Sequence, residues 1–574
     1  MKKNVSRIAS EVIFYLKRRI STLCIVLIAV GATLLNFSHH KWMRQGSVIQ
    51  WDVKSYYAYL PAALIYKDLS FQFRKDNIEK FGDLIWPIET PTGKQAIITS
   101  MGLSFLYAPF FGVVHLFSLI SPQYEADGYS VPYRFALVFS ALFYVIIGLL
   151  FLQRVLRRFF TEGVVAMLIL AVGVGTNLLY YYTYEAPMPH AYNFSLISIF
   201  IFLIIVFYEK PNLSKSFYIG LLGGLITLIR PSNIIVLVLL LLWDVKSIKD
   251  FKDRVAFFFL RYRYTLLMIL GFTIVWIPQF AYWYYVSGKI FYFTYGEAGG
   301  KFFFNNPQIT NILISYKKGW FVYTPVMFLA FIGIFTLPKV LKGKFIPVFA
   351  FTLLNIFILS SWWCWWFGGS FGNRAFIDSY GIMAIPLGAL ITFFKRKKIF
   401  YYSLAALIVL LIGFNNFQIQ QYTRQAIHYW WMNKDAYWET FLKLHPTERY
   451  WDVITLPDYE KARQGVYVEV KPERQKMKQS IVPTKQEIIS YIKDNVLIYK
   501  NGENSELQSK KAEELFKKDS ANYAKIIIIE KLQKSIKNNP SLLELIEKKA
   551  KKKGISLDSM VKLDAIWLYE NDKY

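Results

Sequence analysis

The sequence is poor in cysteine and lacks the common motifs of soluble enzymes. Only two cysteines occur, Cys24 inside an apolar run and Cys364 at the edge of a loop, so we expect no disulfide between them. CxxC pairs, an HExxH helix, a Walker loop and a GxGxxG turn are all absent. These absences argue against zinc sites of those types, a dinucleotide-binding domain and transport driven by ATP hydrolysis within this chain.

Acidic residues are also scarce. The 39 Asp and Glu residues are outnumbered by 67 Lys and Arg residues, which gives a formal net charge of +28. A large positive charge often indicates nucleic-acid binding. Here the basic residues flank apolar runs or belong to a mixed-charge tail, a distribution that membrane insertion and anionic lipids favour. We therefore expect the lipid bilayer, and no nucleic acid, as a partner.

Long apolar runs are what the chain has in abundance. Hydrophobic residues make up 55% of it and aromatic residues 18%. Runs close to the roughly 20 residues that a helix needs to cross the hydrocarbon recur along the chain. They cover 20–38, 98–120, 131–152, 163–182, 188–207, 217–243, 264–286, 320–337, 345–361, 379–394 and 399–414. The sequence predicts an all-α polytopic membrane protein with about 11–13 transmembrane helices.

The charged flanks predict the orientation of these helices. The first run follows a basic stretch, residues 1–19, and no cleavage site for a signal peptidase follows the run, so we expect a retained first helix with a cytoplasmic N-terminus. The basic loops 246–263, 339–344 and 395–398 are expected on the same side. The first outer loop, 39–97, and the segments 287–319 and 362–378 are then extracytoplasmic.

One disagreement remains in this topology. Arg154, Arg157 and Arg158 also favour the cytoplasm, but counting forward from the first helix disagrees with counting back from the C-terminus by one crossing. Either 98–120 does not cross simply, or 217–243 is two short crossings separated at Arg230-Pro231. We favour the second interpretation because a proline after a charge in mid-run is a natural break.

The sequence predicts three parts. Residues 1–19 form a cytoplasmic basic terminus, 20–414 a transmembrane module, and 415–574 an extracytoplasmic helical region. In this last region 426–444 is an aromatic-rich helix candidate, and further helices are expected from Pro540 to Gly554 and after Ser556. We interpret the region as a stability or interaction module without chemistry.

Asp52 is the leading candidate for a reactive group. It opens "DVKSYYAYLPAAL" in the first outer loop, where Tyr56, Tyr59 and neighbouring apolar residues follow helical spacing. This pattern predicts a short amphipathic helix in the membrane interface, which would hold a carboxylate at the mouth of the bundle. Such a carboxylate can accept a proton from a hydroxyl or amine. The alternative is that Asp52 only caps the helix.

Four basic residues are expected on the same side of the membrane as Asp52. They are Lys94, His190, Arg230 and Arg374. Cations at the outer end of a helix bundle suit a phosphate whose hydrocarbon tail lies in lipid. The alternative reading makes them structural partners, with Arg374 paired to Asp378 at i,i+4 and His190 buried in the core.

Glycines and large aromatic residues accompany Arg374 in "WWCWWFGGSFGNR". The glycines permit close approach of the backbone to a ligand, and the tryptophans suit either membrane anchoring or stacking on sugar rings. The candidate residues for a substrate pocket are Tyr56, Tyr59, Glu185, Trp366 and Asp378.

The order of these features resembles the GT-C superfamily of integral membrane glycosyltransferases. Five phrases are similar to bacterial members of the dolichyl-phosphate-mannose-protein mannosyltransferase-like group, and the resemblance covers about residues 15–415. These phrases are "GKQAIITSMGLSFLYAPFF", "YEAPMPHAYNFSL", "GLITLIRPSN", "KGWFVYTPVMFLAFIG" and "WWFGGSFGNRAFIDSYG".

The resemblance implies an inverting enzyme of the bacterial inner membrane. It would move a sugar from a polyprenyl-phosphate donor to an extracytoplasmic protein, lipid A or surface glycan. Asp52 matches the position of the base, and Lys94 is the nearest match to a residue that contacts the donor phosphate. Two features depart from relatives: Val53 stands where many carry a second acid, and no Asp-x-Asp pair of the metal-dependent oligosaccharyltransferases follows. No metal and no cofactor beyond the lipid-linked sugar is expected.

Two other functions fit the same features. A transporter or flippase for an anionic lipid or small molecule would also place cations among membrane helices. A non-catalytic membrane scaffold would use the C-terminal region to bind a partner.

Overall fold

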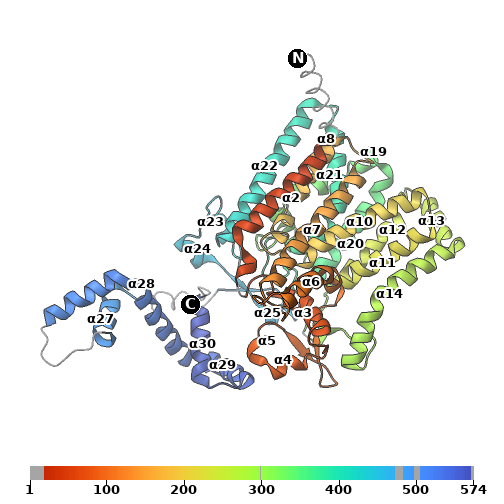
Figure 1. Cartoon of the computed structure of the whole chain (residues 1–574). Coiled ribbons are helices and arrows are strands. Elements are labelled where there is room, and N and C mark those ends of the chain that lie inside the picture. The colour runs from red at the N-terminus through yellow and green to blue at the C-terminus, as the bar shows by residue number, and fades with distance from the viewer. Residues whose placement is uncertain are drawn as a thin grey trace, which may run out of the picture. The chain divides into compact units, whose positions relative to one another are not determined.

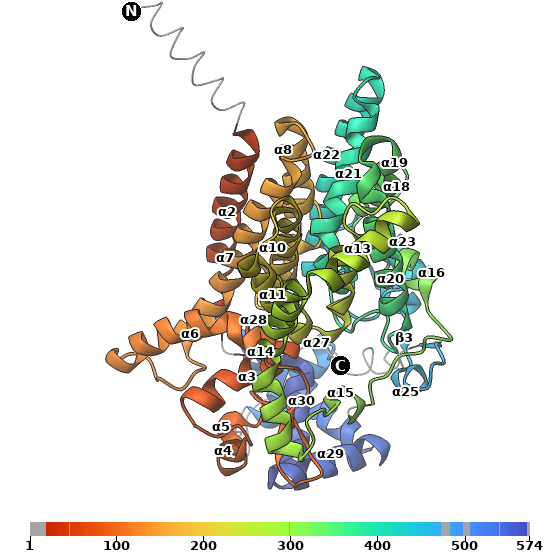
Figure 2. The ribbon, with the colours of Figure 1, turned by 90° about the vertical axis from the view of Figure 1, so that its right-hand side faces the viewer.

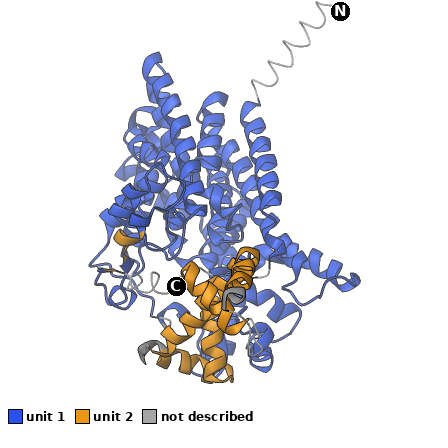
Figure 3. Cartoon of the chain, turned by 90° about the vertical axis from the view of Figure 1, so that its left-hand side faces the viewer, with its two compact units in different colours: residues 1–450, 456–469 blue, residues 451–455, 470–574 orange. Residues whose placement is uncertain are grey.

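The structure, a computed structural model, describes residues 19–44, 46–297, 299–471, 483–496, 505–538 and 540–570. The basic stretch 1–18 lies outside these ranges. The chain divides into two compact units, residues 1–450 with 456–469 and residues 451–455 with 470–574, coloured separately in Figure 3. Each unit is described by itself.

Within the described residues, eight helices are long and apolar enough to cross a membrane. They centre on α2 (Ile20–His39), α6 (Gly102–Ile120), α7 (Val131–Leu156), α10 (Pro189–Glu209), α14 (Tyr262–Ser287), α20 (Phe345–Ser361), α21 (Tyr380–Phe394) and α22 (Lys398–Thr423). Shorter apolar pieces are α8 (Glu162–Val174), α11 (Leu213–Ile229), η2 (Pro231–Val236) with α12 (Leu237–Leu242), and α18 (Val326–Ile334). The predicted all-α polytopic membrane fold is confirmed (Figure 1).

The remaining elements up to residue 470 are short and mostly connect the apolar helices. They are η1 (Lys41–Met43), α3 (Asp52–Leu64), α4 (Gln72–Asp76), α5 (Ile78–Phe81), α9 (Leu178–Tyr181), α13 (Ile248–Leu260), α15 (Thr294–Glu297), α16 (Ile309–Ile314), α17 (Trp320–Tyr323), α19 (Leu337–Val340), η3 (Lys342–Lys344), η4 (Arg374–Ser379), α23 (Lys434–Glu439), α24 (Glu448–Val453) and α25 (Tyr459–Ala462). Antiparallel strands β1 (Pro87–Glu89) and β2 (Gln95–Ile97) form a hairpin, and β3 (Leu456–Pro457) pairs with β4 (Glu469–Val470).

Three of the sequence-based expectations need correction. The run 320–337 is divided into α17, α18 and α19, with the first break at Thr324-Pro325, where proline has no backbone N–H to continue the ladder. The run 163–182 ends its main helix at Val174. In 426–444 only α23 is an α-helix, because its neighbours use other contacts, such as the His428 ring that accepts the Trp430 backbone N–H at 3.0 Å.

The α6 helix runs across the direction of α2 and α7 (Figure 2). Gly102 at its start packs against the end of α11 so closely that a Cβ there would lie 2.7 Å from the Ile229 backbone nitrogen. Its far end leaves Leu116 and Ile120 exposed, at 67% and 83%. The apolar run 98–120 therefore forms a transverse helix, which is the first of the two alternatives for the topology.

The run 217–243 reverses direction at Arg230. It begins just after Glu209, which pairs with Arg158, reaches Arg230 at the end of α11, and returns through η2 and α12 to Asp244. Asp244 in turn pairs with Lys344 at 2.5 Å, in one of the basic loops. The predicted break at Arg230-Pro231 is confirmed.

Contacts gather the basic loops at one end of the bundle. The Ser21 hydroxyl donates to Glu162 at 2.6 Å, and Arg157 pairs with the same carboxylate at 2.9 Å. The opposite end carries α3 and α15 (Figure 2). The structure thus separates a basic end from the end that holds Asp52.

The second unit consists of helices with their own small cores. They are α27 (Lys485–Asn495), α28 (Ser505–Lys537), α29 (Pro540–Lys553) and α30 (Leu557–Glu570). Thr484 and Glu487 form a capping box at the start of α27. The predicted stop at Gly554, which adopts φ +65°, and the cap at Ser556, whose hydroxyl accepts the Ser559 N–H at 3.2 Å, are both confirmed.

Candidate active site

Asp52 is joined to Arg374, the first residue of η4. The guanidinium Nη2 donates to the Asp52 carboxylate at 2.6 Å, and the Asp52 side chain remains 48% exposed while that of Arg374 is 13% exposed. The interpretation of Asp52 as a helix cap is wrong, because Trp51 occupies the N-cap position and forms no side-chain cap bond. Asp52 is instead a reachable carboxylate held by a largely buried cation.

The α3 helix that carries Asp52 is packed into the protein. Most of its residues are buried, whereas an amphipathic helix in the interface would expose one face to lipid and headgroups. The Tyr59 hydroxyl donates to the Thr99 carbonyl at 2.6 Å, and the Ser104 hydroxyl donates to the Tyr56 carbonyl at 2.5 Å. The predicted helix exists, but these bonds fix it as a structural element, with Tyr59 as part of its packing.

A second carboxylate, Asp378, is buried and pairs elsewhere. It accepts hydrogen bonds from Arg230 Nη1 at 2.7 Å, from His190 Nδ1 at 3.1 Å and from Asn233 Nδ2 at 2.7 Å. The suggested i,i+4 pair between Arg374 and Asp378 is therefore wrong. His190 has the role of a buried structural partner, and the cluster fixes the guanidinium of Arg230 at the break between α11 and η2.

Tyr295 of α15 shows that the two ion pairs are close together. Burial raises the pKa of Tyr295 to about 12; the Asp52 carboxylate adds to this shift, and Arg230 and Arg374 oppose it. Tyr56 is hydrogen-bonded to Tyr295 and responds to the same Asp52 and Arg230 charges. Asp52 and both arginines thus lie within electrostatic range of one phenol. Sequence reasoning missed Tyr295 because no motif marks its loop.

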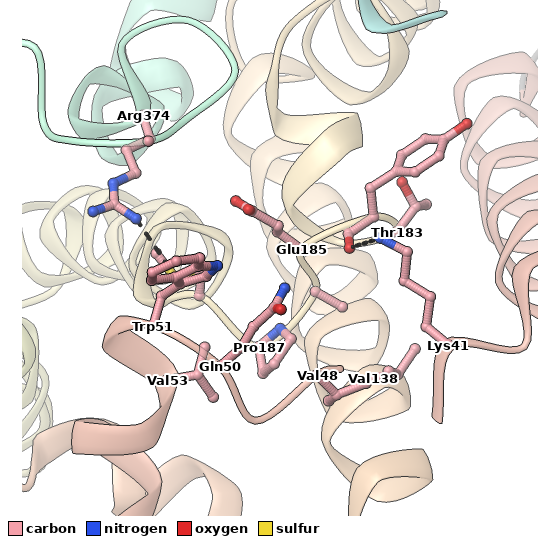
Figure 4. Close-up of a pocket in the computed structure, with 14 residues that line it drawn as sticks. Lys41, Val48, Gln50, Trp51, Val53, Val138, Thr183, Glu185, Pro187 and Arg374 are labelled. Carbon is pink, nitrogen blue, oxygen red and sulfur yellow. Dashed lines mark hydrogen bonds between the residues drawn. The ribbon is translucent and has the colours of Figure 1, made fainter. Parts of the chain in front are cut away.

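A small pocket that opens to solvent, with about 30 Å³ of space for water inside it, lies beside the Asp52–Arg374 pair (Figure 4). Its walls come from η1, from the residues around Trp51, from the segment 183–188 and from Arg374. Polar side chains of Lys41, Gln50 and Glu185 reach it alongside apolar ones. The predicted pocket residue Glu185 is therefore brought together with Arg374.

Hydrogen bonds to the backbone hold the segment that contains Glu185 in place. The Glu185 N–H donates to the Tyr180 carbonyl at 3.0 Å, and Lys41 Nζ donates to the Tyr184 carbonyl at 2.7 Å. Burial raises the pKa of the Glu185 carboxyl, and the cations Arg374 and Lys41 oppose this shift. The pocket thus contains a desolvated carboxyl facing two cationic side chains.

The glycine-rich loop before Arg374 is fixed by partners distant in sequence. The Phe371 N–H donates to the Tyr181 hydroxyl at 3.1 Å, and Lys318 Nζ donates to the carbonyls of Ser370 and Tyr429, the latter at 2.8 Å. Gly372 adopts φ +60°, and a Cβ there would lie 2.9 Å from the Tyr323 side chain. Lys318 lies in a phrase that carried the resemblance, yet its role depends on contacts that sequence reasoning could not foresee.

Two residues predicted for the site, Lys94 and Trp366, do not line this pocket. Lys94 Nζ donates to the Tyr285 carbonyl at 2.9 Å and lies 3.7 Å from the centre of the Tyr285 ring, at the end of α14. Trp366 is 2% exposed, and its indole N–H donates to the Tyr459 hydroxyl at 3.0 Å. Trp366 is thus part of a buried aromatic cluster and does not line the pocket beside Glu185.

No model of a known protein family matches the chain, and no curated protein matches its sequence. Among solved structures, the chain is similar to the archaeal oligosaccharyltransferase AglB from Archaeoglobus fulgidus, determined in complex with an inhibitory peptide and a dolichol-phosphate. The TM-score is 0.42 and the sequence identity is 12%, over 75% of this chain and 60% of that chain. The chain therefore spans less than two thirds of the length of AglB.

Proposed function

We propose that the protein is a GT-C-type glycosyltransferase that moves a sugar from a polyprenyl-phosphate donor to an extracytoplasmic acceptor. The observation that supports this most directly is the Asp52–Arg374 pair beside a polar pocket, at the end of the bundle opposite to the basic loops. By the positive-inside rule that end is extracytoplasmic. The sequence resemblance points to the same reaction class and to Asp52 as the base.

In the proposed reaction Asp52 removes the proton of the acceptor hydroxyl as its oxygen attacks the anomeric carbon. The bond from that carbon to the phosphate oxygen breaks on the opposite face, and the lipid phosphate leaves with the electron pair. Arg374 and Arg230 stabilise the charge that grows on the phosphate. Because a phosphate competes with a carboxylate for the same guanidinium, donor binding at Arg374 would loosen the Asp52 pair and free the base.

The lipid tail of the donor has a suitable place in the membrane part. An apolar groove of about 540 Å³ lies on α6, α10, α11 and α14, and its lining includes Leu203, Tyr218 and Ile274. Leu225, also in the lining, precedes Arg230 by five residues, or about 7.5 Å along a helix. A hydrocarbon chain in this groove would bring its phosphate toward Arg230. Lys94, at the end of α14, is proposed as a further contact for the donor.

The test is transfer by the purified protein in lipid vesicles with polyprenyl-phosphate sugars. Asp52→Asn is expected to abolish transfer while the protein still folds and inserts. Glu79→Gln, an exposed acid of the same outer loop, is the control and should keep full activity. Full activity of Asp52→Asn would refute the role of Asp52.

A transporter of an anionic lipid remains the second candidate. The observation that favours it is a pair of interrupted segments, at Arg230-Pro231 and at Thr324-Pro325, since broken helices mark many transport sites. Transport predicts movement of the lipid-linked substrate between leaflets with its sugar–phosphate bond intact. The same vesicles decide between the two functions, because bond cleavage and movement across the bilayer are measured separately.

A further inference from the structure

Within the part of the chain that the structure describes, two buried polar atoms of residues that line the pocket have no hydrogen-bond partner. One is Nε of Arg374, a donor, and the other is Oε2 of Glu185, an acceptor. Both residues line the same pocket, and in Figure 4 the Glu185 carboxylate points toward the side of the pocket where the Arg374 guanidinium lies. Buried groups of this kind are almost always paired in folded proteins, so the two atoms together indicate a missing ligand group.

The chemistry of the two atoms restricts that group. An ionised phosphate only accepts hydrogen bonds, so it would satisfy Arg374 but would face an ionised Glu185 with like charge. An ammonium only donates, so it would satisfy Glu185 and leave Arg374 unpaired. A hydroxyl accepts one bond and donates another, and it therefore satisfies both atoms at once.

We propose that Glu185 and Arg374 form a subsite for one hydroxyl of a sugar ring, which accepts from Arg374 Nε and donates to Glu185 Oε2. This inference rests on the proposed function and names the group that the site recognises. Because Nη2 of the same guanidinium holds Asp52, the subsite places the sugar beside the base. The hydroxyl belongs either to the sugar of the donor or to a glycan acceptor.

The positions of both atoms are set by rigid surroundings. Glu185 follows a backbone held by Tyr180 and Lys41, and Arg374 follows the loop held by Lys318. A site built to bond a hydroxyl rejects an analogue without it, because the buried polar atoms are then left unpaired. Glu185 is thus a specificity-determining residue, and its contribution is visible only with ligands that carry the matching hydroxyl.

Binding in detergent or nanodiscs tests the proposal without requiring transfer. Two series of ligands are compared. The donor series is a short-chain polyprenyl-phosphate sugar and analogues that each lack one sugar hydroxyl. The acceptor series is a methyl glycoside and analogues that each lack one hydroxyl. Wild type should bind one monodeoxy analogue at least about tenfold more weakly than the parent, and the series in which this occurs identifies the source of the hydroxyl. In Glu185→Leu the parent and that analogue should bind equally. Glu89→Gln, an exposed acid of β1, should retain the wild-type discrimination.

Two outcomes would overturn the subsite. If the wild type distinguishes no monodeoxy analogue in either series, only water occupies the gap. If the discrimination persists in Glu185→Leu, groups other than Glu185 recognise the hydroxyl. The more conservative Glu185→Gln keeps an amide oxygen as an acceptor, so it should recover part of the discrimination if the folded site is intact. Failure of the transferase proposal is seen separately, as sugar binding without transfer by the wild type.

Discussion

Asp52 and Arg374 are separated by 322 positions in the chain, and a hydrogen bond of 2.6 Å joins their side chains beside the pocket. Their unequal exposure divides their roles. Asp52 is half exposed and accessible to an acceptor, whereas Arg374 is largely enclosed and is anchored by its loop. The pair therefore combines an accessible carboxylate with a fixed cation.

This division predicts that activity and stability respond differently to Asp52→Asn. Water reaches the Asp52 carboxylate, and the amide of Asp52→Asn can still accept a hydrogen bond from Arg374, so we expect a smaller loss of stability than on breaking a fully buried pair. Transfer should fall by at least about 10³-fold if Asp52 is the base, since general-base catalysis and positioning are lost together. Parallel measurement of the thermal midpoint and of initial transfer rates checks this. A large loss of stability would assign Asp52 a structural role instead.

Asp378→Ala should show the reverse pattern. The substitution leaves Arg230 and His190 buried without their carboxylate partner, and breaking a buried ion pair in this way costs about 3–5 kcal/mol. Unfolding in detergent should therefore shift strongly toward lower temperature. Glu125→Ala, which breaks an ion pair with Lys80 that is exposed on both sides, is the matched control and should cost much less.

The burial of the Lys318 side chain predicts a specific dependence of folding stability on pH. Burial lowers its pKa well below the ordinary value of 10.5, so between the lowered folded-state pKa and 10.5 the unfolded chain binds more protons at this site than the folded chain. Stability contributed at this position therefore rises as pH increases from the folded-state pKa toward 10.5, and it falls as pH decreases.

The measurement is the thermal midpoint of wild type and Lys318→Met between pH 7 and pH 9.5. The difference between the two proteins isolates Lys318 from other titrating groups. The wild type should gain stability relative to the variant as pH rises. Parallel curves for the two proteins would contradict the lowered pKa.

Two glycines of α6 allow a matched packing experiment. A side chain at Gly102 would meet the backbone of Leu228 and Ile229, next to Arg230, whereas Gly112 has open space around its Cβ direction. Gly102→Leu should destabilise the protein by about 1–3 kcal/mol through overpacking and should reduce transfer by displacing Arg230. Gly112→Leu should stay within about 0.5 kcal/mol of wild type. Equal effects at both positions would contradict the close contact between α6 and α11.

If α6 runs transversely, cysteines placed before and after it should react with a reagent added to the same side of the membrane. Single cysteines at Thr92, before α6, and at Gln123, after it, should both react with an impermeant maleimide added to one side. A cysteine at Lys395, between α21 and α22, should react only from the other side. The native Cys24 and Cys364 are buried and give a low background. Opposite labelling at Thr92 and Gln123 would show that α6 crosses.

The sequence determined the class of fold and the candidate base. Apolar runs of membrane length and a proline after Arg230 are local signals, because helix length and backbone hydrogen bonding in lipid depend on neighbouring residues only. These signals identified the break in the run 217–243 and most of the helices. The direction of α6 carried no such signal, because an apolar helix of this length is compatible with either course until its packing partners are known.

Only the tertiary structure decided how the charged residues pair. Sequence spacing suggested Arg374 with Asp378, yet Arg374 joins Asp52 and Asp378 joins Arg230 and His190. An ion pair depends on the distance between side chains in space, and residues far apart in the chain compete with near neighbours for the same partner. For the same reason Tyr295, Lys318 and the unpaired atoms of Glu185 and Arg374 became visible only when the helices were packed together.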